Sequence, residues 1–161
     1  MKHSAALCSL ALALGGCAAA LVPGTSREPD VIASFGASVE ESRLPDGVRV
    51  LEYPRQPLGL ENWRVSLSPD GTVRAVEQLL DEPHFARLKP GMSMDEVTRE
   101  LGRSHSTSRF SNLDEDVISW LYRDPFERKF FNAHFDAAGH LKYTSRTLDP
   151  TTVVPGGRRR R

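Results

Sequence analysis

The second half of this chain repeats the first half in order and in spacing. Residues 21–26, Leu-Val-Pro-Gly-Thr-Ser, correspond to residues 88–93, Leu-Lys-Pro-Gly-Met-Ser. From Trp63 onward, corresponding residues of the two copies are separated by a constant number of positions. Trp63 corresponds to Phe131, Val65 to Ala133, Leu67 to Phe135 and Gly71 to Gly139. Internal duplication predicts two units of one architecture, here residues 25–80 and 81–150. Few matched residues are identical, so chance or a shared hairpin pattern is the alternative.

The second copy carries the signals of two helices. Ser93 and Glu96 form a capping-box pattern, and Gly102 is a suitable helix end. Between them lies an apolar stripe with the spacing i, i+3, i+7, formed by Met94, Val97 and Leu101. A shorter helix is expected before it, with Asp81 as its cap and Pro83 in its first turn. In the first copy we expect one short helix, over about residues 26–35.

Three strands are expected to follow the helix in each copy. Apolar residues alternate with period two over Val117–Tyr122 and Lys129–Phe135, and turn sequences stand at residues 69–71 and 136–139. Six strands and about three helices predict an α+β fold, in which two tandem units each place helices on one face of a three-stranded antiparallel sheet.

The amino terminus has the pattern of a secretory signal. Lys2 precedes an apolar run that ends at Leu14-Gly15-Gly16-Cys17, and this run is shorter than the about twenty residues that span a bilayer. The ending resembles the lipobox of bacterial lipoproteins, which implies removal of residues 1–16 and attachment of acyl chains such as palmitate at Cys17. Residues 17–24 would be a short tether, and Ala18 favours the outer membrane of a Gram-negative bacterium. An ordinary signal cleaved near residues 18–20, or a buried apolar segment, is the alternative.

Cysteine and charge content narrow the possibilities further. Cys8 lies inside the expected signal, so Cys17 is the sole cysteine that remains, and we expect no disulfide within the chain. Residues 151–161 are expected to be a flexible basic tail. Its last residues, Arg158, Arg159, Arg160 and Arg161, are candidate contacts for anionic lipid, with a solvated tail as the alternative. The rest of the mature chain has an acidic excess, which argues against nucleic acid as a partner.

The second copy resembles the SmpA/OmlA (BamE-like) family of outer-membrane lipoproteins. The resemblance lies in residues 88–97, Leu101-Gly102, residues 120–123 and residues 135–139, although Ser104 stands where members often have proline. It implies two helices followed by a three-stranded sheet, and a non-enzymatic adaptor or scaffold in outer-membrane protein assembly or envelope maintenance. The partner would be another envelope protein.

The tandem arrangement resembles the β-lactamase inhibitor proteins, in which two such units present a concave binding surface. This resemblance implies the alternative function, a periplasmic protein-binding or inhibitor module. Both interpretations predict that the chain is not an enzyme.

Motifs for catalysis, cofactors or metals are not found in the sequence. His134, Asp136 and His140 could be imagined as metal ligands, but a solvent-facing strand pair explains them better, and Asp114-Glu115-Asp116 is expected to be a solvated loop. We therefore predict no cofactor and no metal. Trp63 and Trp120 are expected in the core, whereas Tyr53, Tyr122 and Arg123 are candidate partner-binding residues.

Overall fold

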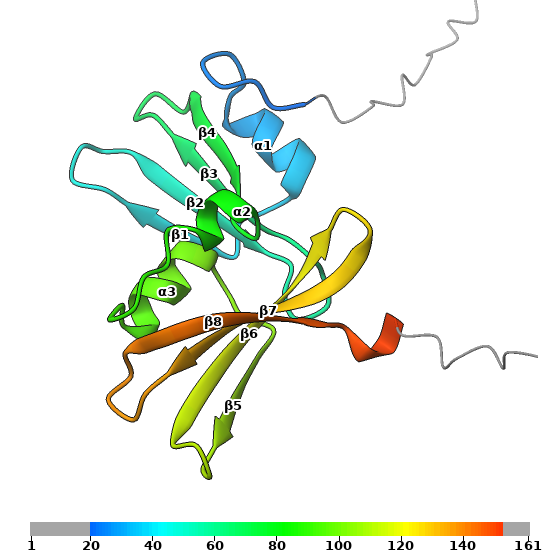
Figure 1. Cartoon of the computed structure of the whole chain (residues 1–161). Helices are drawn as coiled ribbons and strands as arrows, with labels where there is room; N and C mark the ends of the chain where they lie inside the picture. Colours follow the sequence, from blue (N-terminus) through cyan, green and yellow to red (C-terminus); the bar gives the residue numbers. More distant parts are fainter. Residues whose placement is uncertain (1–19, 153–161) are drawn as a thin grey trace, which may run out of the picture.

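The computed structural model describes residues 20–152, which form an α+β protein with two four-stranded antiparallel sheets (Figure 1). The first sheet has the order β1-β2-β3-β4 and the second the order β5-β6-β7-β8. The first half contains α1 (Glu28–Phe35), β1 (Glu40–Arg43), β2 (Arg49–Pro54), β3 (Asn62–Leu67) and β4 (Val73–Gln78). The second half contains α2 (Glu82–Phe85), α3 (Met94–Leu101), β5 (Ser106–Phe110), β6 (Glu115–Asp124), β7 (Glu127–Phe135), β8 (Leu141–Leu148) and the 3₁₀ turn η1 (Pro150–Thr152).

Each sheet has four strands, so the expectation of three was wrong. The additional strands are β1 and β5, which form one edge of each sheet and pair with β2 and β6. Every residue in both strands is exposed, so neither strand has the alternating apolar pattern that would reveal it. Backbone pairing, rather than burial of side chains, holds these edges in place.

Capping and a tight contact fix the ends of α3. The Ser93 amide donates to Glu96 Oε2 at 2.8 Å, and the Glu96 amide donates to Ser93 Oγ at 3.3 Å, which is the capping box expected from the sequence. Gly102 ends the helix with φ of 72°, and a Cβ at this position would lie 3.1 Å from Asn62 Nδ2. Glycine therefore allows both the turn and the close approach of the first half.

Each sheet buries one face under its own helix. Val31 of α1 packs on the first sheet in a core with Leu51, Tyr53, Val65, Leu67 and Val73. In the second half, Val97 and Leu101 of α3 pack on the sheet residues Ile118, Trp120, Tyr122, Phe131, Ala133, Phe135 and Leu141. Phe85 of α2 stacks flat on Phe131, with 4.0 Å between ring centroids. Trp120 is fully buried and Trp63 packs against the first core, as expected.

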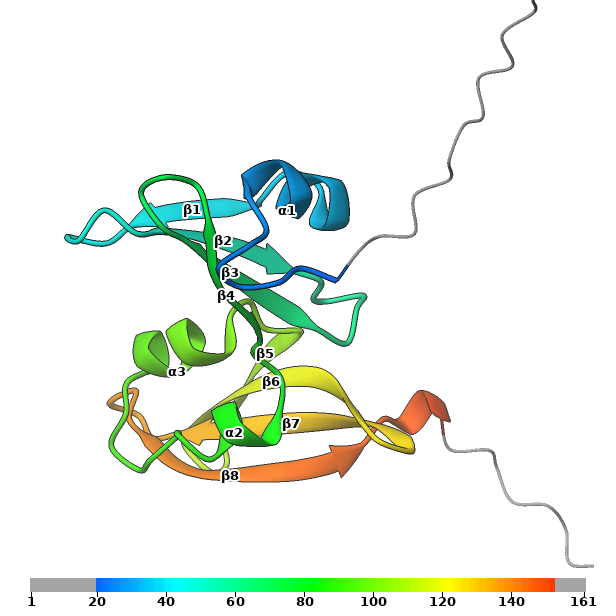
Figure 2. The same cartoon turned by 90° about the horizontal axis from the view of Figure 1, so that it is seen from above.

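Helix α3 also contacts the outer face of the first sheet, so it lies between the two sheets (Figure 2). Asn62 Nδ2 donates to the carbonyl oxygens of Leu101 and Arg103 at 2.7 and 2.8 Å, and an Arg64 guanidinium nitrogen donates to the carbonyl of Arg99 at 2.6 Å. These bonds satisfy carbonyls that the end of a helix leaves without partners. The layers are therefore α1, the first sheet, α2 with α3, and the second sheet.

Several features expected from the sequence lie outside the residues that the structure describes. The signal segment, Cys17 and residues 158–161 lie outside residues 20–152, and the first residues of the expected flexible tail belong to η1. No helix within residues 20–152 has the length and apolar character needed to cross a bilayer.

Candidate functional site

The far face of the second sheet carries no helix from the described part of the chain, and we call it the open face (Figure 2). Its side chains alternate along each strand with those of the second core. Register places them in rows across β6, β7 and β8, with Ser119, Asn132 and Ser145 in one row and Val117, His134 and Tyr143 in the next. Loop 55–61 contacts one end of this face, where Gln56 Nε2 donates to the Leu121 carbonyl at 2.6 Å.

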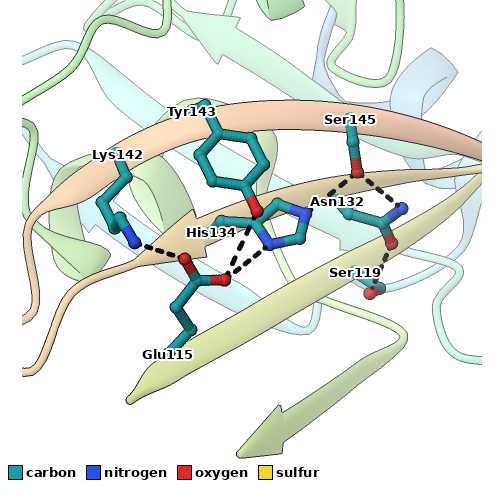
Figure 3. A network of polar contacts seen from close by, with 7 residues as sticks. All are labelled: Glu115, Ser119, Asn132, His134, Lys142, Tyr143 and Ser145. Atoms are coloured by element: carbon teal, nitrogen blue, oxygen red, sulfur yellow. Dashed lines mark hydrogen bonds and ion pairs between the residues drawn. The ribbon is translucent and has the colours of Figure 1, made fainter. Parts of the chain in front are cut away.

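A hydrogen-bond network connects these rows (Figure 3). Ser119 Oγ donates to Asn132 Oδ1 at 2.8 Å, and Asn132 Nδ2 donates to Ser145 Oγ at 3.4 Å and to Thr147 Oγ1 at 3.3 Å. Ser145 Oγ lies 2.9 Å from His134 Nε2. Since Asn132 already donates to Ser145, the serine hydroxyl is free to donate to Nε2, which assigns the proton of a neutral His134 to Nδ1.

Glu115 anchors the network at its other end. The residue is 4% exposed, and its carboxylate accepts from Lys142 Nζ, from His134 Nδ1 at 3.3 Å and from the Tyr143 hydroxyl at 3.4 Å. The ammonium group of Lys142 holds the pKa of the Glu115 carboxyl below its usual range, and Glu115 in turn raises the pKa of Lys142. A carboxylate this little exposed stays charged because every partner stabilises the charge.

Tyr143 is the aromatic group that the network presents to solvent. Its ring stacks on His134 with 4.2 Å between centroids and an interplanar angle of 15°. The residue is nevertheless 46% exposed, and Phe110 on the same face is exposed to the same extent. One side of the tyrosine ring is thus fixed by the protein and the other is free, a property of aromatic anchors in protein interfaces.

The order Ser145, His134, Glu115 matches the order of a hydrolase triad, in which a carboxylate orients the histidine that activates a serine. Two contacts distinguish this arrangement. Ser145 Oγ also accepts a hydrogen bond from Asn132, and the charge of Glu115 is compensated by Lys142. Both contacts favour a fixed polar surface, because one occupies a lone pair of the serine oxygen and the other engages the carboxylate that would have to orient the histidine.

The candidate partner-binding residues do not meet on one surface. Tyr53 and Tyr122 lie in the first and second cores, with 3% and 6% exposed, so little of either ring is available to a partner. Tyr122 shares the face of Trp120, and that face packs against α2 and α3. Arg123 is exposed beyond them near the end of β6.

Of the residues expected to form a loop at 114–116, only Asp114 lies in a turn, whereas Glu115 and Asp116 begin β6. Arg109 pairs with Asp114 and Asp116, and Glu115 turns toward the open face. Asp136 accepts hydrogen bonds from the amides of Ala138 and His140 and so closes the β7–β8 turn. Within residues 20–152 no group of three acidic, histidine or cysteine side chains is placed to hold a metal.

A cleft of about 420 Å³ lies between α3 and the outer face of the first sheet. The side chain of Arg64 lines this cleft, where it forms a salt bridge with Glu52 at 2.7 Å and donates a hydrogen bond to the carbonyl of Arg99. These contacts join the two halves, which makes the cleft part of the joint between them.

Comparisons with known proteins give distant similarities. No protein-family model matches the chain, and the curated proteins contain no match. Among solved structures, that of an osmotically inducible lipoprotein, OsmE, is 22% identical with a TM-score of 0.38, over 42% of this chain and 78% of that one. A structure described as a β-lactamase inhibitor protein from Streptococcus mutans is 13% identical with a TM-score of 0.34, over 77% of this chain and 84% of that one. At these scores neither similarity supports an argument about function.

Proposed function

We propose that this chain is a lipid-anchored protein of the bacterial envelope that binds another protein through the open face. The observation that supports the proposal is a sheet face that no helix of the described part of the chain covers, on which a buried Glu115 fixes His134 and a half-exposed Tyr143. The anchor is Cys17, proposed from the lipobox pattern alone.

The shape of the open face favours a protein as its ligand. Its polar groups extend in rows across three strands, and its exposed aromatics, Tyr143 and Phe110, stand on different strands. A broad surface with aromatic anchors and polar surroundings is typical of protein interfaces. Since the network already fixes these side chains, binding costs less conformational entropy than it would on a mobile surface.

Two finer functions are compatible with such a surface. In the first, the chain is an adaptor or scaffold for outer-membrane protein assembly or envelope maintenance, held at the outer membrane by Cys17. In the second, it is an inhibitor or binding module for a periplasmic enzyme. An adaptor needs its anchor, whereas an inhibitor that lacks residues 1–17 should bind its target with unchanged affinity.

Site-specific photo-crosslinking in cells tests the proposed function. A benzoylphenylalanine at position 143 keeps an aromatic ring on the open face, and one at position 32 provides a control, because Ile32 on α1 is 53% exposed away from this face. We expect position 143 to capture a discrete protein that position 32 does not, with mass spectrometry identifying it. Equal capture at positions 143 and 32, or no capture at position 143, would overturn the proposal.

A further inference from the structure

Several chain segments lie on one side of the molecule, which we call the anchor end. They are the β6–β7 turn, loop 55–61 and the two limits of the described chain, which are Ala20 near α1 and, well apart from it, Thr152 at the end of η1 (Figures 1 and 2). Phe126 and Thr152 border the same shallow hollow together with Arg123 and Leu148. The opposite end is formed by the β1–β2 and β7–β8 turns.

The two most exposed large apolar side chains of residues 20–152 stand at the anchor end. Phe126 in the β6–β7 turn is 96% exposed, and Leu58 in loop 55–61 is 93% exposed. Leu148, beside Phe126, is 49% exposed. Single exposed apolar residues are common, but two nearly complete exposures on neighbouring loops indicate a surface that becomes covered.

Basic residues without a carboxylate partner accompany these apolar tips. Arg55 and Arg123 are exposed, and among the described residues neither forms a salt bridge. The nearby acidic residues are paired, Asp124 and Glu127 with Lys129 and Asp149 with Arg128. Protruding apolar side chains flanked by arginines match the chemistry of a membrane interface, where apolar tips enter the headgroup region and guanidinium groups meet anionic headgroups.

The short tether favours a membrane as the partner of the anchor end. Cys17 precedes Ala20 by three residues, a span of roughly 11 Å at most. Acyl chains at Cys17 would therefore keep the anchor end, rather than the opposite end, at the bilayer surface.

We infer that the anchor end lies against the membrane, with Phe126 and Leu58 in the headgroup region and Arg55 and Arg123 at anionic phospholipids. The inference rests on the lipid anchor of the proposed function and adds an orientation to it. Strands β6, β7 and β8 run between the anchor end and the opposite end (Figure 2), so the open face stands beside the membrane and remains accessible to a protein.

Environment-sensitive labels on the full acylated chain test the orientation. Phe126→Cys and Leu58→Cys each introduce a free thiol for a nitrobenzoxadiazole label, because the Cys17 sulfur carries lipid. Leu44→Cys in the β1–β2 turn and Leu113→Cys in the β5–β6 turn provide controls, since both residues are exposed and both turns lie away from the anchor end (Figure 1). In pure vesicles of phosphatidylethanolamine and phosphatidylglycerol, we expect a several-fold rise in emission at positions 126 and 58, quenched by spin-labelled lipid, and no rise at the controls. Equal responses at all four positions, or shielding of position 126 in cell membranes but not in pure vesicles, would overturn the inference.

Mass spectrometry of the same samples separates the two proposals. A chain without acyl groups contradicts the proposed anchor; if its labels at positions 126 and 58 also stay unshielded on added vesicles, the inference fails too. In the acylated chain, replacing Arg55 and Arg123 by glutamine should reduce the response only in vesicles that contain phosphatidylglycerol. Arg74→Gln, at an arginine on β4 that pairs with Asp46, should leave the response unchanged.

Discussion

The two halves of the molecule share the order of a helical segment followed by four strands, but they differ in what covers their sheets. The first sheet lies between α1 and α3, whereas the second has helices of the described residues, 20–152, on one face alone. On the first sheet, Asn62 and Arg64 bond the carbonyls at the end of α3. On the second, Asn132 and His134 bond their own neighbours in the sheet. Similar scaffolds thus supply a joint in one copy and a free surface in the other.

The largest expected effects come from the two cores, and they test whether the halves fold as one unit. Phe135→Ala should lower the free energy of unfolding by about 3–5 kcal/mol and Leu67→Ala by about 2–5 kcal/mol, because both side chains are fully buried. We expect each variant to unfold in a single transition, since α3 joins both sheets. Tryptophan fluorescence follows the two halves separately. In a Trp63→Phe background it reports on Trp120 in the second half, and in a Trp120→Phe background it reports on Trp63 in the first half. Two separate midpoints would show that the halves are independent.

An asparagine on the outer face of each sheet allows a more direct comparison. Asn62→Ala should lower the free energy of unfolding by about 2–3 kcal/mol, because it leaves the carbonyls of Leu101 and Arg103 without their donor in the buried contact between the two halves. Asn132→Ala should cost about 1 kcal/mol, since its partners are hydroxyls near solvent. Equilibrium denaturation measures both. A cost for Asn132 equal to that for Asn62 would contradict the distinction between joint and open face.

Carboxylates in the two halves should differ in how they respond to acid. The folded-state pKa values of Glu115 and Glu28 are both lowered, by Lys142 and by Arg49. A lowered pKa contributes stability above the ordinary carboxyl range, near 4.5, and this contribution disappears as the pH falls through the folded value. Glu115→Gln should therefore flatten the acid limb of the stability curve more than Glu28→Gln does, because the side chain of Glu115 is 6% exposed and that of Glu28 is 33% exposed. Denaturation midpoints measured from pH 7 to pH 3 test the order of the two effects.

Local patterns explain which parts of this architecture the sequence predicts. Ser93 and Glu96 cap the start of α3 and Gly102 ends it, so both ends of this helix can be predicted from local sequence without tertiary information. The alternation in β6 likewise identifies its two faces, and placing Trp120 in the core already requires Tyr122 to be there. Strands β1 and β5 have no such pattern because all their side chains are exposed.

The open-face network depends on register rather than on local pattern. Glu115, His134 and Ser145 lie on three different strands, and their side chains meet because β6, β7 and β8 pair with the observed offsets. A shift of one residue would turn these side chains to the opposite face. The sequence contains the residue types, but the pairing that brings them together is a tertiary property.

The smallest expected effect concerns Ser145 and decides between a binding surface and a catalytic one. Ser145→Ala removes one partner of His134, but Asn132 keeps Thr147 Oγ1 as an acceptor, so the cost should stay below about 1 kcal/mol. A fluorophosphonate probe should label wild type and Ser145→Ala equally little, because the serine accepts from Asn132 and the Glu115 charge is compensated by Lys142. Labelling of wild type that disappears in Ser145→Ala, with intact-mass analysis locating the adduct, would make the open face a hydrolase site. Equal, weak labelling of the two proteins would agree with the proposed role of this face in recognition.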